Sequence, residues 1–149
     1  MNYFNLILLA FLGGVFLAIQ GALNARLGVL LKSPLLATVI AYGVSVLFAL
    51  ICVFFKKGTL PTVGTVRNIP FYMWFSGGVF SVVGILLYYY TIPRLGVGTM
   101  ISFGLCGQLI LAVIAGHFGW LQLPEEPLTL KKIIGVVTMI VGIVLINIK

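Results

Sequence analysis

The sequence predicts an all-α integral membrane protein, a bundle of five transmembrane helices. Apolar residues make up 62% of the chain and charged residues only 7%, whereas soluble domains average about 45–50% and about 25%. The few charges also divide the chain into five apolar runs, which suit helices that cross a hydrocarbon core of about 30 Å. We therefore expect a single transmembrane domain over residues 1–149, with short loops and no separate soluble domain.

The first two spans are expected at residues 4–26 and 34–55. Arg26 closes the first apolar run, and because the chain begins without the basic segment of a signal peptide, we expect this span to be retained. Ser33 and Pro34 then form a favourable helix start, since serine caps a helix and proline suits its first position.

The third span is expected at residues 70–91. A polar linker over residues 58–69 precedes it and is the longest irregular stretch of the sequence. We expect Pro93 to end the helix, because proline lacks the backbone N–H that a continuing helix requires.

The fourth and fifth spans are expected at residues 96–118 and 131–148. The loop between them, residues 124–127, holds both acidic residues of the chain. The last apolar run is shorter than the ~20 residues that usually cross a bilayer, but lysines at its two ends can snorkel to the membrane surface and compensate.

The basic residues lie at the ends of the spans, where they can meet anionic lipid headgroups. Five helices place five of them on one side of the membrane and four on the other, namely Lys56, Lys57, Arg67, Lys131 and Lys132 against Arg26, Lys32, Arg94 and Lys149. The positive-inside rule orients a protein by an excess of such charges, and a difference of one is hardly an excess. Two interpretations stay open: one orientation set by loop details, or dual topology with oppositely inserted copies pairing as an antiparallel homodimer.

Small and polar residues form stripes at helical spacing on several spans. Such stripes cost free energy in hydrocarbon unless they pack on protein or line a wet cavity. The stripes comprise Gly13, Leu17, Gln20, Gly21, Asn24 and Gly28 in the first span, Trp74, Gly77, Ser81, Gly84, Tyr88 and Thr91 in the third, Ile101, Gly104, Gln108, Ala112 and Ala115 in the fourth, and Thr138 with Gly142 in the fifth.

These stripes admit two interpretations. In the first they are helix-packing seams, in which amides bond across interfaces and the contacts are made by Gly13, Gly21, Gly77, Gly84, Gly104 and Gly142. In the second they line a substrate cavity, whose candidate residues are Gln20, Asn24, Trp74, Ser81, Tyr88 and Gln108. Amides there would supply hydrogen-bond donors and acceptors, and the aromatic side chains would supply stacking or cation–π faces.

Residue types that are missing from the spans exclude several functions. No Asp or Glu lies within any span, which rules out a carboxylate coupled to protons or cations there. Because no nucleophile stands beside a base, we expect no catalytic residue and no enzyme. Cys52 and Cys106 lie apart in apolar runs, so we expect no metal site and no cofactor. The scattered basic residues likewise argue against nucleic acid as a partner.

His117 is the one side chain that titrates near neutral pH. It lies near the end of the fourth span, where a histidine can be an ordinary interfacial residue. The alternative is a gating or proton-linked role.

Six phrases, spread in order over nearly the whole chain, resemble the YdcZ-like branch of the bacterial drug/metabolite transporter (DMT) superfamily. They are Gln20–Gly28, Ser33–Ala37, Trp74 with Gly77-Gly78, Pro93–Gly96, Gly107–Leu109 and His117–Gly119. The resemblance implies a DMT-like five-helix protein of the bacterial inner membrane, found in relatives as paired or fused halves. It also implies kinship with four-helix multidrug exporters that work as antiparallel dimers.

The chain departs from the resembled pattern at one position. Gly116 stands just before the His-Phe-Gly phrase, where the family leads us to expect an acidic residue. The first span also lacks the glutamate that the four-helix exporters use for proton coupling. Their coupling mechanism therefore does not transfer to this chain.

These observations lead to one main hypothesis and one alternative. The main hypothesis is a small inner-membrane transporter, or transporter subunit, that moves a small organic solute by alternating access. Its partners would be the lipid bilayer and a second subunit, either an antiparallel copy of itself or a paralogue. The alternative is a non-transporting membrane scaffold or accessory subunit whose stripes are packing seams.

Overall fold

A computed structural model confirms the all-α membrane fold and describes residues 2–56, 61–122 and 124–148. Within these ranges, five helical segments are long and apolar enough to cross a membrane. The spanning segments are α1 (Tyr3–Leu30), α2 (Pro34–Phe55), η1 (Phe71–Trp74) with α4 (Ser76–Leu95), α5 (Val97–His117) and α6 (Leu130–Asn147), and the shorter elements are α3 (Val63–Arg67) and η2 (Trp120–Gln122).

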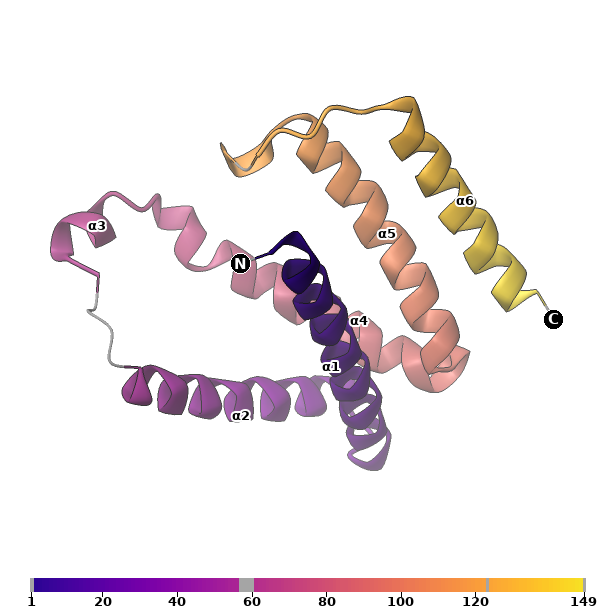
Figure 1. Cartoon of the computed structure of the whole chain (residues 1–149). Helices are drawn as coiled ribbons and strands as arrows, with labels where there is room; N and C mark the ends of the chain where they lie inside the picture. The colour runs from indigo at the N-terminus through magenta and orange to yellow at the C-terminus, as the bar shows by residue number, and fades with distance from the viewer. Residues whose placement is uncertain (1, 57–60, 123, 149) are drawn as a thin grey trace. The chain divides into compact units, whose positions relative to one another are not determined.

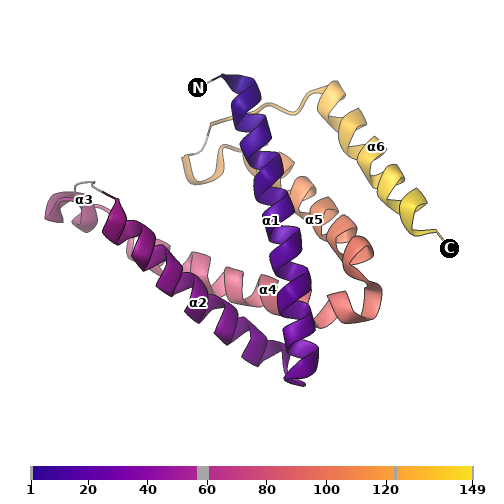
Figure 2. The ribbon, with the colours of Figure 1, turned by 60° about the horizontal axis from the view of Figure 1, so that its bottom comes forward.

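The helices group into two compact units, Met1–Arg94 and Leu95–Lys149. In the first unit, α1 and α2 meet near the C-terminal end of α1 and diverge from there in a V (Figures 1 and 2). In the second unit, α5 and α6 lie side by side (Figures 1 and 2). The expectation of one transmembrane domain over residues 1–149 stays a prediction.

Helix α1 continues four residues past Arg26 and ends at Leu30. A charged residue ends an apolar run, but it does not end a helix. The helix ends where a capping motif supplies hydrogen bonds to its last carbonyls. The N–H of Ser33 donates to the Gly28 carbonyl at 2.9 Å, and the N–H of Lys32 donates to the Val29 carbonyl at 3.1 Å. This is the Schellman arrangement, which usually has glycine in its left-handed position. Here Lys32 occupies that position with φ 51°, a conformation that costs a non-glycine residue about 1–3 kcal/mol.

The start of α2 matches the expected cap. The Ser33 hydroxyl accepts a hydrogen bond from the N–H of Leu36 at 3.2 Å, and Pro34 is the first helical residue. Gly28 allows the close approach of the two helices, because a Cβ added there would lie 3.3 Å from Pro34 Cα and 3.5 Å from Ala37 Cβ. At this point α1 and α2 therefore make contact through backbone and small side chains rather than through long side chains.

Helix α4 does not end before Pro93, as we expected, but passes through it to Leu95. A proline in the last turn interrupts only one backbone hydrogen bond, since most carbonyls of that turn have no partner within the helix in any case. The Arg94 side chain also donates to the Tyr90 carbonyl, one turn earlier in the helix.

The linker before the third span is less irregular than expected. It contains the short helix α3, whose N-terminus is capped by the Thr62 hydroxyl accepting from the N–H of Thr65 at 3.4 Å. Residues 58–60 of the expected linker lie outside the described residues.

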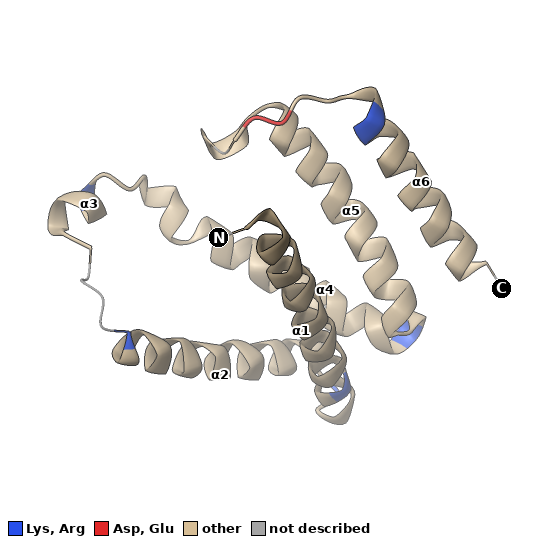
Figure 3. Cartoon of the chain, viewed as in Figure 1, with Lys and Arg blue, Asp and Glu red and all other residues tan. Residues whose placement is uncertain are grey.

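Apolar side chains cover the outside of the helices, as a bilayer environment requires; Phe54, for example, is 85% exposed. Charged residues gather at helix ends and in the connecting segments, and the helix centres carry none (Figure 3). Two of the expected headgroup anchors, Lys57 and Lys149, lie outside the described residues.

The Gly28 contact leads to a stability prediction. Replacing Gly28 with valine should lower the free energy of unfolding by about 1–3 kcal/mol, the usual cost of overpacking, and this should appear as a lower melting temperature of the detergent-purified protein. Gly43→Val, on the spanning helix α2, is the matched control, because a Cβ there meets none of the described residues within 4 Å. Equal melting temperatures for the two variants would contradict this account of the α1–α2 contact.

Candidate functional site

The two amides of the first-span stripe meet at one tyrosine. Gln20 donates from Nε2 to the Tyr89 hydroxyl at 3.2 Å, and Asn24 is a side-chain hydrogen-bond partner of the same tyrosine. Tyr89 is only 1% exposed, whereas the two amides are half-buried. Helices α1 and α4 are thus joined by a polar cluster, Gln20–Asn24–Tyr89, inside an otherwise apolar unit.

Tyr89 was not among the residues that the sequence singled out; its neighbour Tyr88 was. Tyr88, Tyr89 and Tyr90 are consecutive, and successive helical residues point about 100° apart. Only the packing of α4 against α1 decides which of the three meets the amides. Tyr89 shares the buried face of α4 with Ile92, three residues later, but Ile92 also lies four residues after Tyr88, so the sequence carries no signal that singles out Tyr89.

A second polar contact joins α2 to α4. The hydroxyl groups of Tyr42 and Ser81 share a hydrogen bond of 2.6 Å. Ser81 was a predicted cavity residue, and Tyr42 was not. Together with the Gln20–Asn24–Tyr89 cluster, this contact links α1, α2 and α4, the three long helices of the first unit.

The other cavity candidates are dispersed. Trp74 lies in η1, before the start of α4, and is 58% exposed. Tyr88 is partly buried on α4, next to Tyr89. Gln108 lies on α5, which belongs to the second unit. The structure therefore brings Gln20 and Asn24 together. That Trp74, Tyr88 and Gln108 line one cavity with them stays a prediction.

The glycines of the stripes differ in what surrounds them. On α1, Gly21, Ala25 and Gly28 are buried, and a Cβ added at Gly21 would lie 3.6 Å from the Ile92 side chain. In contrast, an added Cβ would meet nothing within 4 Å among the described residues at Gly13, Gly77, Gly84 or Gly142. Gly104 is partly buried on α5. The first stripe is thus closely packed in its C-terminal half and open in its N-terminal half.

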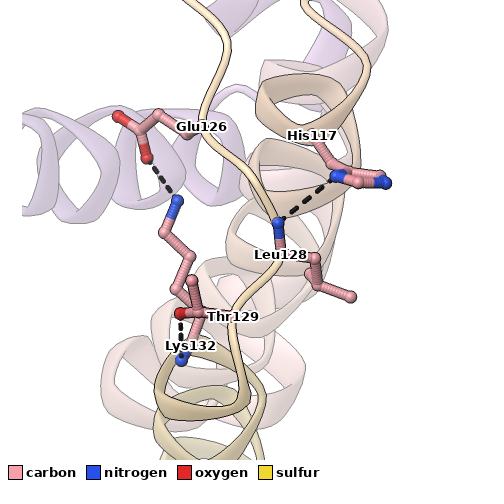
Figure 4. Close-up of polar contacts among 5 residues, drawn as sticks. All are labelled: His117, Glu126, Leu128, Thr129 and Lys132. Carbon is pink, nitrogen blue, oxygen red and sulfur yellow. Dashed lines mark hydrogen bonds and ion pairs between the residues drawn. The ribbon is translucent and has the colours of Figure 1, made fainter.

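In the second unit, the loop after η2 folds back over the end of α5 (Figure 4). The N–H of Leu128 donates to His117 Nδ1 at 3.3 Å, and the N–H of Glu126 donates to the Gly116 carbonyl at 2.8 Å. Because Nδ1 accepts a hydrogen bond, it carries no proton in this arrangement. The gating or proton-linked role expected for His117 stays a prediction.

The same loop is tied to the start of α6. Glu126 Oε2 and Lys132 Nζ form an ion pair of 2.9 Å (Figure 4), and the Thr129 hydroxyl caps α6 by accepting from the N–H of Lys132 at 3.3 Å. The hydrogen bond from Lys132, reinforced by its charge, lowers the pKa of the Glu126 carboxyl. Glycine is favoured at Gly119, which has φ 56° and where a Cβ would lie 2.7 Å from Glu125 Cγ.

Helices α5 and α6, with the loop between them, line an open hollow of about 370 Å³. Its walls are mostly apolar, and the Glu126–Lys132 ion pair lies at its edge. The residues around it are Leu109, Ala112, Val113, Gly116, Gly135 and Val136 together with that pair. In the described ranges, no three His, Cys, Asp or Glu side chains gather in a way that could hold a metal ion.

These features define a multi-pass helical membrane protein whose hydrogen-bonding side chains join its helices. The chain belongs to the YdcZ family of the drug/metabolite transporter superfamily: the family model described as "Putative inner membrane exporter, YdcZ" matches residues 5–145. No curated protein and no solved structure matched the chain. The family match confirms the resemblance seen in the sequence phrases, places the protein in the inner membrane, and indicates transport rather than catalysis.

The Glu126–Lys132 pair leads to a prediction about pH. Since the pKa of Glu126 is lowered in the folded protein, the ion pair contributes stability above the pKa of the unfolded carboxyl and loses it as pH falls through the lower, folded pKa. Lys132→Gln should move the pKa of Glu126 back up toward its ordinary value.

The measurement is a ¹³C NMR titration of the protein labelled at the glutamate carboxyl carbons, which gives only two signals because the chain has two acidic residues, Glu125 and Glu126. Lys131→Gln is the control and should leave the titration of Glu126 nearly unchanged. If both variants shift it equally, general charge rather than the Glu126–Lys132 pair sets the pKa.

Proposed function

We propose that this chain is a subunit of an inner-membrane exporter that moves a small organic solute by alternating access. The observation that supports this most is the Gln20–Asn24–Tyr89 cluster, in which two half-buried amides meet a buried hydroxyl within the spanning helices. Each amide offers two donors and two acceptor sites, so a bond to Tyr89 leaves capacity for a solute.

The open half of the α1 stripe supports a second subunit. A Cβ added at Gly13 or Gly14 would meet none of the described residues within 4 Å, and membrane helices use such small residues to approach one another closely. We propose that a second copy, inserted in the opposite orientation, packs there and closes the cavity. The nearly equal numbers of basic residues on the two sides of the membrane are compatible with this arrangement. A paralogous subunit could take the same place.

A specific observation also favours the scaffold alternative. Gly21, Ala25 and Gly28 are buried against neighbouring helices, which is how a packing seam is built. In that case the Gln20–Tyr89 bond would serve only to join α1 and α4, and membrane hydrogen bonds of this kind contribute roughly 1 kcal/mol. The two functions differ in whether the amides are needed for flux or only for folding.

A flux measurement distinguishes the two functions. A screen for solutes that raise the melting temperature of the purified protein first selects a solute, whose radiolabelled form is then followed into proteoliposomes. Gln20→Leu and Asn24→Leu should each reduce flux about fivefold, because each removes a hydrogen bond worth roughly 1 kcal/mol. Tyr89→Phe, which removes only the shared hydroxyl, should also reduce it.

Asn5→Leu is the control, since Asn5 is an exposed amide at the start of the same helix. Unchanged flux in folded Gln20 and Asn24 variants would overturn the binding role and favour the scaffold.

A topology measurement tests the antiparallel pair. Alkaline phosphatase, active outside the inner membrane, and a green fluorescent protein, fluorescent in the cytoplasm, are each fused to the C-terminus. Both fusions should give comparable signals, because the basic residues hardly bias insertion. An added pair of lysines beside Ser33 should shift the signals toward one side. A strictly one-sided signal from the unmodified chain would eliminate an antiparallel pair of identical copies.

A further inference from the structure

A hollow of about 360 Å³ lies in the first unit, where the C-terminal ends of α1 and α4 meet the N-terminal end of α2. Its walls include Lys32, Arg94 and Tyr89, together with Gly28, Pro34 and Pro93. It lies toward the membrane surface relative to the proposed solute site, because Asn24 and Gln20 are about one and two turns earlier on α1.

The charge in this hollow is not balanced within the unit. Lys32 and Arg94 both line it, and residues 1–94 contain no Asp or Glu. Two positive side chains around one hollow repel each other, and the repulsion is stronger beside a low-dielectric membrane than in water. An anion between them would turn this repulsion into attraction.

Two contacts restrain the Arg94 side chain in a position where it could bind an anion. Its guanidinium lies 3.7 Å above the centre of the Tyr90 ring and donates from Nη1 to the Tyr90 carbonyl. A guanidinium has five N–H donors in a planar fork, which suits phosphate oxygens. Because the side chain is already ordered, binding an anion would cost little further side-chain entropy.

Lys32 occupies a backbone position that favours glycine. It has φ 51° in the Schellman motif that ends α1, and non-glycine residues adopt this conformation at a steric cost. Strained backbone of this kind clusters at functional sites. Compared with the usual glycine, Lys32 adds an amine at the edge of the hollow.

The start of α2 adds a third positive contribution. Pro34, the first residue of this 22-residue helix, lines the hollow. The N-terminal end of a helix carries a partial positive charge from its aligned peptide dipoles, and this favours anions.

We propose that this hollow is a binding site for a phosphate group, with Lys32 and Arg94 as its charged ligands. Its place at the ends of three spanning helices is the depth of lipid headgroups, so the phosphodiester of an anionic phospholipid is the expected source. The site adjoins the proposed solute site, since Tyr89 lines the hollow, but its charged ligands are not part of the solute cluster and its test needs no transported solute.

The test uses the full-length protein in maltoside micelles, with isothermal titration and melting temperature as readouts. Dioctanoyl phosphatidylglycerol should bind and raise the melting temperature, whereas dioctanoylglycerol, which has the same chains without the phosphate, should not. Lys32→Gly and Arg94→Gln should each weaken binding about tenfold, as expected for the loss of a charge-assisted hydrogen bond. Lys131→Gln, on α6, should not.

Folding and binding are separable here, because Lys32→Gly relieves the strained backbone. Without lipid, this variant should melt at the same temperature as the wild type or higher, and yet bind more weakly. Arg94→Lys, which keeps the charge, should bind better than Arg94→Gln. If inorganic phosphate binds with the same dependence on Lys32 and Arg94, the phosphate site is supported and lipid as its source is overturned. Equal binding by the wild type, Lys32→Gly and Arg94→Gln would overturn the site.

Discussion

The Tyr89 hydroxyl is the group on which the polar organisation of the first unit depends. Hydrocarbon offers no water to satisfy an amide, so Gln20 and Asn24 can be tolerated on a spanning helix only if protein or a wet cavity receives them. Tyr89 receives both. This requirement places the end of α4 against α1, which in turn brings Ile92 onto Gly21. Packing and hydrogen bonding therefore select the same pair of helix faces.

The glycine-rich face of α1 is a packing seam in one half and an open face in the other, so each of the two interpretations of its sequence fits one half. From Gly21 to Gly28 it is a packing seam, closed by α2 and α4. Around Gly13 it is open. In the proposed exporter, the packed end would hold the subunit together and the open end would meet a partner or a solute. The amides lie at the boundary between the two halves, which is where a solute-binding group would be most useful.

The charged residues lie at the ends of the helices, where some of them hold the connecting segments in place. Lys132 pairs with Glu126 and ties the loop to α6, and His117 receives the backbone of the same loop. In the first unit, Lys32 and Arg94 line the same hollow without a carboxylate nearby in the chain. The net charge of +7 fits the proposed phosphate site, since anionic headgroups can balance cations that the chain's own acidic residues do not.

The sequence by itself determined the five spanning helices, the Ser33 cap and the family, because these depend on local composition, local spacing and ordered phrases. It could not place the ends of α1 and α4, because backbone caps outweigh a charge at Arg26 and a proline at position 93. Only the tertiary structure decided that Tyr89, rather than Tyr88, meets the amides of α1, and that Lys32 and Arg94 share one hollow. The physical reason is that neighbouring tyrosines on a helix are equivalent in sequence and become different only when another helix packs against one of them.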